Sequence, residues 1–218
     1  MYSIEHSILD YKVTDDDLSI YNPYLKKLKG IIDENSHLDR RELADLLISQ
    51  RPDIVSEYSF TIPYYDILKK AASYSPIVEI GAGSGYWARC LSEFGADVIA
   101  YDSFPPGEQS PWEWDKGNSW FDDTWFGIIE GDESAAAHHP ERTLFLAWPM
   151  PMSPMAYNTL VHYKNAGGHT LIYIGDPNPA SSGDEHFYNE LANHKLVEKS
   201  DLYSWPGIHE KLFIYSLE

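Results

Sequence analysis

A glycine-rich segment carries the residue types best suited to holding a ligand. It reads Pro76-Ile-Val-Glu-Ile-Gly-Ala-Gly-Ser-Gly-Tyr-Trp-Ala88, so an apolar run containing Glu79 is followed by Gly81, Gly83 and Gly85 and then by helix-compatible residues. Glycines let the backbone turn tightly and approach a ligand at the carboxyl end of a strand, where open α/β sheets bind theirs. The spacing therefore predicts a nucleotide-type binding site.

The same segment excludes two common nucleotide-binding motifs. The dinucleotide motif G-x-G-x-x-G needs its third glycine where Tyr86 stands, and the Lys-Ser/Thr ending of a phosphate-binding P-loop is absent. Seventeen residues after Gly85, the strand-like run Asp97-Val-Ile-Ala-Tyr-Asp102 ends in a carboxylate. A carboxylate there can accept hydrogen bonds from both ribose hydroxyls. The glycine loop and this carboxylate together indicate an adenosine-bearing ligand without a pyrophosphate.

At these residues the chain resembles the class I S-adenosylmethionine-dependent methyltransferases, whose first motif reads E/D-x-G-x-G-x-G. Glu79 and the three glycines match that motif, and Asp102 occupies the acidic position after the second strand. The resemblance implies a Rossmann-like fold and S-adenosyl-L-methionine as cofactor. The alternative is a glycine turn beside an unrelated surface aspartate.

The resemblance also implies the further residues of the cofactor site. Ile128-Ile-Glu-Gly-Asp132 is similar to the third strand and the polar residue near the adenine, although an ordinary turn at Gly131 and Asp132 is the alternative. The predicted cofactor-binding residues are Tyr58, Glu79, Gly81, Ala82, Gly83, Gly85, Trp87, Asp102, Asp132 and Trp148.

The residues expected to do chemistry are those expected at the carboxyl edge of the sheet. Trp148 and Pro149 stand where amino-group methyltransferases show D/N-P-P-Y/F, so the polar residue that would grip a planar amine is missing, and DNA adenine methylation is disfavoured. Methyl transfer is an in-line displacement, so a general base is optional. Our candidates for catalysis are Trp148, Asp176 and Tyr64; the alternatives are a turn cap for Asp176 and packing for Tyr64. The adjacent His138 and His139 lack a metal-binding spacing, so no metal site is predicted.

The chain further resembles a subset of predicted bacterial and fungal methyltransferases, whose pattern implies no substrate. The matching segments are Phe60-Thr-Ile-Pro63, Val78 to Trp87, Asp97 to Asp102, Arg142 to Pro149 and Ile172-Tyr-Ile-Gly-Asp176.

The chain divides into two parts by the spacing of its apolar residues. From about Asp15 to Tyr74 apolar residues recur at helical spacing, which predicts about three helices separated at Pro23, Pro52 and Pro63. From Pro76 onward short apolar runs alternate with helical segments, the pattern of a mostly parallel sheet covered by helices. The expected strands are Ile77–Ile80, Val98–Tyr101, Thr143–Trp148, Thr170–Ile174, Leu196–Glu198 and Leu212–Leu217, and the expected helices are Tyr86–Phe94, Met155–Asn165 and Asp184–His194.

The predicted fold class is therefore α/β. We expect a Rossmann-like three-layer sandwich preceded by a helical extension over residues 1–75, with the sheet domain over 76–218 and both forming one compact unit. The resemblance implies seven strands with the last one antiparallel, and the Pro206-Gly207 turn suits the final hairpin. The segment from Phe104 to Asp123, rich in aromatic residues, is either a functional loop or a packed cover.

Composition limits the partners. The 218 residues include 34 acids and 16 bases, a net charge of −18, which disfavours nucleic acid and anionic membranes. The single cysteine, Cys90, excludes an internal disulfide and is interpreted as core packing. No apolar run reaches the length of a membrane span and the N-terminus does not resemble a signal peptide, so we expect a cytoplasmic protein. The oligomeric state is left open.

The sequence thus predicts a methyltransferase that acts on a small molecule or a peptide. Ten acids and four tryptophans between Asp102 and Arg142 favour a neutral or amine-bearing acceptor, unless those acids are merely solvated and the tryptophans packed. A cofactor-binding, non-catalytic partner subunit of another enzyme is the second hypothesis. A nicotinamide oxidoreductase is the third, and Tyr86 disfavours it.

Overall fold

A seven-stranded sheet forms the centre of the molecule. The computed structural model describes residues 3–106, 118, 120–178 and 180–218. The sheet order is β3-β2-β1-β4-β5-β7-β6. The strands are β1 Ile77–Ile80, β2 Val98–Asp102, β3 Ile128–Glu130, β4 Thr143–Ala147, β5 Thr170–Gly175, β6 Lys195–Asp201 and β7 Lys211–Ser216. The central strands are short, buried and rich in β-branched residues, as expected for a parallel sheet that is covered on both faces.

Strand β7 runs antiparallel to both of its neighbours, whereas β1 to β5 pair in parallel. Ile172 of β5 lies opposite Ile214 of β7, and β6 then pairs with β7 as the outer strand of a hairpin. This topology confirms the α/β, Rossmann-like fold with seven strands and an antiparallel last strand.

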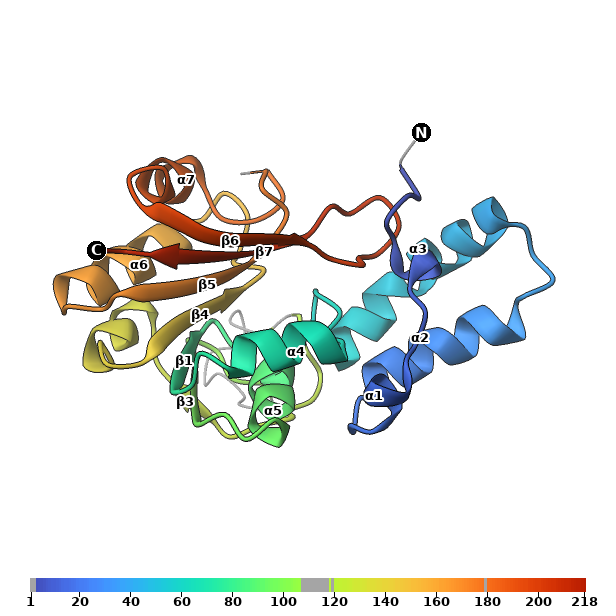
Figure 1. The fold of residues 1–218 in the computed structure, drawn as a ribbon, viewed down its shortest axis with the longest axis horizontal. Coiled ribbons are helices and arrows are strands. Elements are labelled where there is room, and N and C mark those ends of the chain that lie inside the picture. Colours follow the sequence, from blue (N-terminus) through green and yellow to red (C-terminus); the bar gives the residue numbers. More distant parts are fainter. Residues whose placement is uncertain (1–2, 107–117, 119, 179) are drawn as a thin grey trace, which may run out of the picture.

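Helices cover both faces of the sheet, so the fold has three layers (Figure 1). Alternate strand residues point to opposite faces: Ile77 packs with α4 (Tyr65–Ala72) and α5 (Tyr86–Glu93), whereas Val78 packs with η2 (Glu133–His138), α6 (Met155–Asn165) and α7 (Glu185–Leu191). Cys90 of α5 is 2% exposed, and burial raises the pKa of its thiol to about 12, which agrees with a packing role.

The N-terminal segment forms more helices than the sequence predicted. After the short η1 (Ile8–Asp10), the described part of this segment holds α1 (Asp15–Leu18), α2 (Pro23–Glu34), α3 (Arg40–Glu57) and α4. The prediction of a break at Pro52 was wrong, because Pro52 lies inside α3. Proline costs a helix interior about 3 kcal/mol. Burial of Leu47, Ile54 and Val55 on the two sides of Pro52 offsets that cost.

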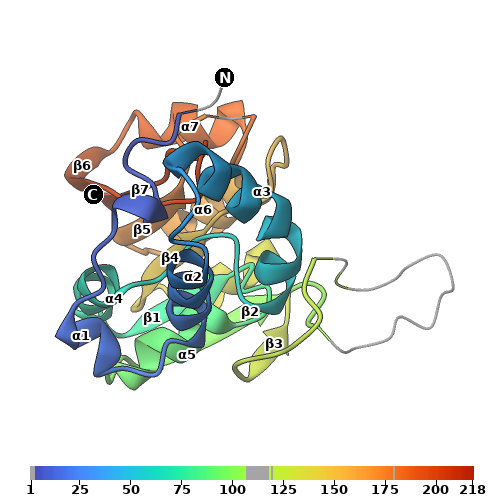
Figure 2. The same cartoon turned by 90° about the vertical axis from the view of Figure 1, so that its right-hand side faces the viewer.

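The helical layer and the sheet share one hydrophobic core, although α2 and α3 extend away from the sheet as a helical pair (Figures 1 and 2). Tyr24 of α2 is fully buried with Ile77 of β1 and Trp205 of the β6–β7 connection. The Trp205 indole Nε1–H donates to the Tyr24 hydroxyl (3.0 Å), and that hydroxyl donates to the Ser59 carbonyl (3.0 Å). Residues 1–75 therefore complete the core rather than lie beside it.

Beside this core lies a buried carboxyl group without a hydrogen bond. Glu210 is 2% exposed, and neither of its carboxyl oxygens has a partner; Arg51 Nε is buried and unpartnered as well. Burial raises the pKa of Glu210 to about 8, and the nearby Ser204 hydroxyl and the Arg51 charge oppose that shift in part. Burial thus favours the protonated form of Glu210 in the folded protein.

Among the residues that the structure describes, no helix is long and apolar enough to cross a membrane.

Candidate functional site

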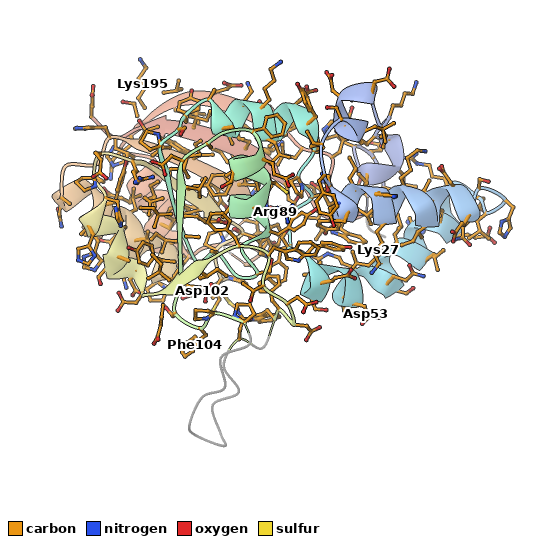
Figure 3. The ribbon with its side chains drawn as sticks, turned by 90° about the horizontal axis from the view of Figure 1, so that it is seen from below. Lys27, Asp53, Arg89, Asp102, Phe104 and Lys195 are labelled. Atoms are coloured by element: carbon orange, nitrogen blue, oxygen red, sulfur yellow. The ribbon has the colours of Figure 1, made fainter. Side chains whose placement is uncertain are left out.

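A cavity of about 680 Å³ opens at the carboxyl ends of β1, β2, β3 and β4. The aspartate at the end of β2 and Phe104, two residues further, lie together on the side of the molecule seen in Figure 3. The described lining residues are Ser59, Phe60, Thr61, Glu79, Ile80, Gly81, Ala82, Gly83, Trp87, Asp102, Ser103, Phe104, Asn118, Trp120, Phe121, Gly131, Asp132, Glu133, Ala147, Trp148, Pro149, Met150, Pro151 and Met155.

The glycine loop forms the floor of this cavity between β1 and α5. Gly83 has a φ of +58°, and its N–H donates to Asp102 Oδ2 (2.8 Å). Gly81 has a φ of +73°, and a Cβ there would lie 2.6 Å from the Met155 methyl; a Cβ on Gly83 would overlap the Phe121 ring. Only glycine combines these left-handed conformations with so close an approach of the Met155 and Phe121 side chains, and both glycines line the cavity.

Asp102 joins this loop to the end of β2. Its Oδ2 accepts the Gly83 N–H, and its Oδ1 accepts the N–H of Phe104 (2.9 Å). Burial raises the pKa of this carboxyl group above its usual range, and the two N–H donors oppose the shift. Two backbone donors therefore fix a carboxylate at the cavity wall.

Replacing Asp102 with alanine is expected to weaken binding of S-adenosylmethionine and of its demethylated product by about 1–3 kcal/mol, because buried polar partners lose their acceptor. Asp102→Asn is the matched control, since it keeps one acceptor oxygen and should lose less. Calorimetric titration of the three proteins measures the difference. Equal affinities would remove Asp102 from the binding site.

Glu79 supplies an unpartnered polar atom to the same wall. It is 2% exposed, and its Oε2 has no hydrogen-bond partner. Burial raises its pKa to about 8, with the Ala88 N–H opposing and the negative charge of Asp102 adding to the shift. A ligand with a positively charged donor, such as an ammonium group, would satisfy that oxygen and favour the ionised carboxylate.

Beyond β3 the wall contains two more acids. The exposed Asp132 caps η2: its Oδ1 accepts the Ser134 N–H (2.9 Å) and hydroxyl (2.5 Å), and these bonds lower its pKa. Glu133, which the sequence analysis did not single out, accepts a hydrogen bond from the Asn158 amide (2.9 Å) and also lines the cavity. Asp132 is therefore both a helix cap and a cavity residue.

Trp148 follows β4 in an unusual backbone conformation. Its φ is +52°, rare for a bulky residue, and its N–H donates to the Ile174 carbonyl of β5 (2.7 Å). The indole lies nearly parallel to the Phe60 ring, with an interplanar angle of 22° and centroids 6.3 Å apart. Pro149 continues the wall. The chain thus holds a strained residue where it faces the cavity, which is typical of functional positions.

Four of the predicted site residues do not line this cavity. Tyr64 is 4% exposed and packs against Tyr11 and Tyr203, which agrees with the alternative of a packing role. Asp176 lies after β5, where its carbonyl accepts the hydroxyl of Tyr188 (2.9 Å), and its side chain does not reach the cavity.

The other two make structural contacts at the glycine loop. The Tyr58 carbonyl accepts the Ser84 hydroxyl, and Gly85, with φ +74°, is the last glycine of the loop and caps α5. Contact of either residue with a cofactor stays a prediction.

Several cavity residues were missed or left undecided by the sequence analysis. Phe60 and Thr61 come from the segment before α4, and the Thr61 hydroxyl accepts the Trp87 indole N–H (2.6 Å). Trp120 and Phe121 lie in the aromatic segment whose role was open; Trp112 and Trp114 lie outside the described residues. Trp125 instead packs on Tyr58. The sequence signal that could have identified Phe60 and Thr61 is the similarity of Phe60-Thr-Ile-Pro63 to the subset of methyltransferases described above.

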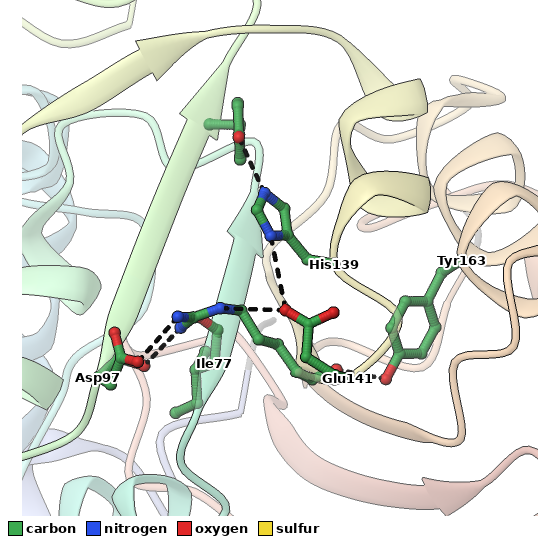
Figure 4. A network of polar contacts seen from close by, with 7 residues as sticks. Ile77, Asp97, His139, Glu141 and Tyr163 are labelled. Atoms are coloured by element: carbon green, nitrogen blue, oxygen red, sulfur yellow. Dashed lines mark hydrogen bonds and ion pairs between the residues drawn. The ribbon is translucent and has the colours of Figure 1, made fainter.

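A polar network ties the opposite ends of these strands (Figure 4). The Arg142 guanidinium, 14% exposed, donates to the Ile77 carbonyl (3.3 Å) and to both the carbonyl (3.2 Å) and Oδ2 (2.8 Å) of Asp97. His139 Nε2 lies 2.9 Å from the Tyr101 hydroxyl, and its Nδ1 lies 3.8 Å from Glu141. Within the described ranges no group of three or more histidine, cysteine, aspartate or glutamate residues could hold a metal.

We expect Arg142→Met to lower the melting temperature by roughly 3–6 °C, since strand-end carbonyls lose their donor, while cofactor affinity stays unchanged. Arg89→Met is the matched control: Arg89 makes a helix-surface pair with Glu93, and such pairs contribute little. Scanning calorimetry and titration report the two quantities. A variant with normal melting but weakened cofactor binding would contradict the structural role.

Comparisons with known proteins give structural likeness only. No family model matches the chain, and no curated protein matches its sequence. The chain is similar to magnesium protoporphyrin IX methyltransferase from Synechocystis, solved with bound S-adenosylmethionine, at 12% identity and a TM-score of 0.44, over 70% of this chain and 79% of that one. It is also similar to tRNA (uracil-54, C5)-methyltransferase from Pyrococcus abyssi, solved with S-adenosyl-L-homocysteine, at 15% identity and a TM-score of 0.45, over 74% of this chain and 40% of that one.

Proposed function

We propose that this protein is an S-adenosylmethionine-dependent methyltransferase that acts on a small molecule or a peptide. One observation carries the proposal: a single cavity collects the bare backbone of Gly83, the fixed carboxylate of Asp102 and the unpartnered carboxyl oxygen of Glu79. These groups match an adenosine-bearing ligand that carries an ammonium group and lacks a pyrophosphate.

Each part of the cavity has a role in this proposal. Asp102 would hold the ribose hydroxyls, and Glu79 would face the ammonium group. The acids after β3, Asp132 and Glu133, suit the adenine amino group. Trp148 and Pro149, on the other side of β1 in the sheet order, would face the acceptor.

When bound, S-adenosylmethionine supplies a methyl group activated on a positively charged sulfur. The chain's own contribution is alignment and exclusion of water: the rings of Phe60, Phe121 and Trp148 surround the space in front of the glycine loop. The ammonium group would favour the ionised form of Glu79 in the complex, and the carboxyl groups of the cavity would then favour the cationic cofactor over the neutral sulfur product.

Electrostatics favours acceptors without phosphate groups. The net charge is −18, and among the described lining residues there is no lysine, arginine or histidine. One of the structurally similar proteins is a tRNA methyltransferase. In the present cavity, however, a polyanion would meet four carboxyl groups and no basic side chain among the described lining residues. Nucleic acid therefore stays outside the proposed substrates.

Transfer of a labelled methyl group from S-adenosylmethionine to a metabolite and peptide extract tests the proposal. We expect label in low-molecular-weight or peptide fractions, and loss of that label in Gly83→Ala. Tight cofactor binding without any labelled acceptor would favour the alternative, a non-catalytic partner subunit. Binding of a dinucleotide but not of S-adenosylmethionine would contradict both.

Two further parts of the proposal concern the whole chain. Residues 1–75 would act as a cap over the domain formed by residues 76–218, because Phe60 and Thr61 complete the cavity from the N-terminal side. The cytoplasmic location expected from the sequence belongs to the proposal as well, and cell fractionation checks it.

A further inference from the structure

The cavity has two sides of different chemistry. All four of its described carboxyl groups belong to the side formed by β1, β2 and β3: Glu79 lies in β1, Asp102 ends β2, and Asp132 and Glu133 follow β3. On the other side lie the residues after β4 and the segment around Phe60, where the described lining contains no acid, base, tyrosine or cysteine. We call this second side the acceptor side, which rests on the proposed function above.

Aromatic rings from three separate segments meet on the acceptor side. Phe60 is the common partner: its ring meets Trp120 edge-on (5.7 Å, 66°) and Phe121 edge-on (5.5 Å, 73°), and it lies nearly parallel to Trp148. The hydrogen bond from the Trp148 N–H to β5 fixes the backbone of that residue. Ring faces held in this way suit a flat ligand.

The apolar surface continues to the mouth of the cavity. Phe104, Trp120 and Met150 all line the cavity, yet they are 53%, 56% and 54% exposed. Large apolar side chains left in water around a cavity mark a place where an apolar ligand binds. The body of the acceptor is therefore expected to be apolar and uncharged.

The chemistry of this side restricts the accepting atom. The described lining of this side holds no side chain that could remove a proton, which favours a nucleophile that already carries a free lone pair at neutral pH. An aliphatic amine is protonated, and a hydroxyl is a weak nucleophile until it loses its proton. A pyridine-type ring is planar and neutral, and the lone pair of its nitrogen lies in the ring plane. Such a ring fits the aromatic surface, and its nitrogen needs no base.

We propose that the acceptor is an uncharged nitrogen heteroaromatic ring that is methylated on its ring nitrogen. The nitrogen lone pair forms the new N–CH₃ bond, and the electron pair of the broken S–CH₃ bond stays on sulfur, giving a neutral thioether. The positive charge moves from sulfur to the ring, and no proton is released. Trp148 and Phe60 then stabilise that cationic ring through their faces, so the interaction strengthens as the reaction proceeds.

The test uses the full chain, labelled S-adenosylmethionine and four probes of similar size: isoquinoline, benzylamine, phenol and phenyl phosphate. We expect N-methylisoquinolinium by mass spectrometry and no product from the other three. Product from benzylamine, phenol or phenyl phosphate in place of isoquinoline would overturn the inference, as would the absence of product from isoquinoline. Calorimetry distinguishes failure of this inference from failure of the proposed function. Cofactor binding without the ring product refutes only the acceptor class, whereas the absence of cofactor binding refutes the proposed function.

A pair of variants tests the aromatic surface. Phe60→Leu should raise KM for isoquinoline about tenfold and change the cofactor Kd less than twofold, because it removes ring contacts on the acceptor side only. Phe94→Leu is the control, since Phe94 packs against Tyr65 away from the cavity and should leave both constants unchanged. An unaltered KM in Phe60→Leu would overturn the role of the rings.

Discussion

Gly83→Ala is expected to weaken S-adenosylmethionine binding about a hundredfold or more, while the apo protein still folds. At φ +58° the added Cβ points at the Phe121 ring on the cavity floor, where a cofactor must approach the backbone. Relief of this overlap moves the Phe121 ring or the loop into the space that the cofactor needs, and a hundredfold loss of affinity corresponds to about 2.8 kcal/mol.

Gly95→Ala is the matched control for that variant. Gly95 has φ +83° with nothing within 4 Å of an added Cβ, so its substitution adds backbone strain without a collision. Both variants should lose thermal stability, but only Gly83→Ala should lose binding. Normal affinity in Gly83→Ala would show the loop to be a structural turn and remove the main support for the proposed function.

The second large effect is the dependence of the free energy of unfolding on pH. The pKa of Glu210 is raised from 4.5 to about 8 by burial, so the folded protein holds a proton that the unfolded chain releases. The contribution of Glu210 to the free energy of unfolding is fully present below about pH 4.5. It falls by about 1.4 kcal/mol per pH unit as the pH rises from there toward 8. Glu210→Gln cannot ionise, and its free energy of unfolding at pH 8.5 should exceed that of the wild type by about 2–4 kcal/mol.

Urea unfolding at pH 5.0, 7.0 and 8.5 measures this difference. Glu198→Gln serves as the control, because the hydrogen bond with Lys70 lowers the pKa of Glu198. That stabilisation is present above the ordinary pKa of a glutamate and is lost in acid, so removing it gives no gain at pH 8.5. Parallel pH profiles for the wild type and Glu210→Gln would mean that Glu210 does not stay protonated in the folded chain.

The sequence predicted the sheet well because short apolar runs and the glycine loop are local signals. Strand β1 and helix α6 begin and end as expected, and the acid at the end of β2 was placed correctly. Pro52 was misread because local propensity does not report the burial on both sides of it.

The acceptor side was harder to predict because its parts are far apart in the chain. Phe60, Trp120 and Trp148 carry no shared motif, and only the fold brings their rings together. Tyr64 and Asp176 were suggested because both were expected at the carboxyl edge of the sheet, Asp176 directly after the fifth parallel strand. Sequence order alone does not reveal that Tyr64 packs against Tyr203 instead.

The hydrogen bond between Trp205 and Tyr24 spans 181 positions, and it has a consequence for how the chain is made. On the ribosome, α2 and α3 emerge long before the β6–β7 hairpin, so the apolar faces that Leu28 and Leu47 present to the shared core wait for their last partners. A nascent or truncated chain that ends before Trp205 therefore exposes an uncovered core. Such chains should be clients of chaperones and proteases, and a ribosome stalled upstream of residue 205 should leave its product sensitive to digestion throughout the N-terminal helices.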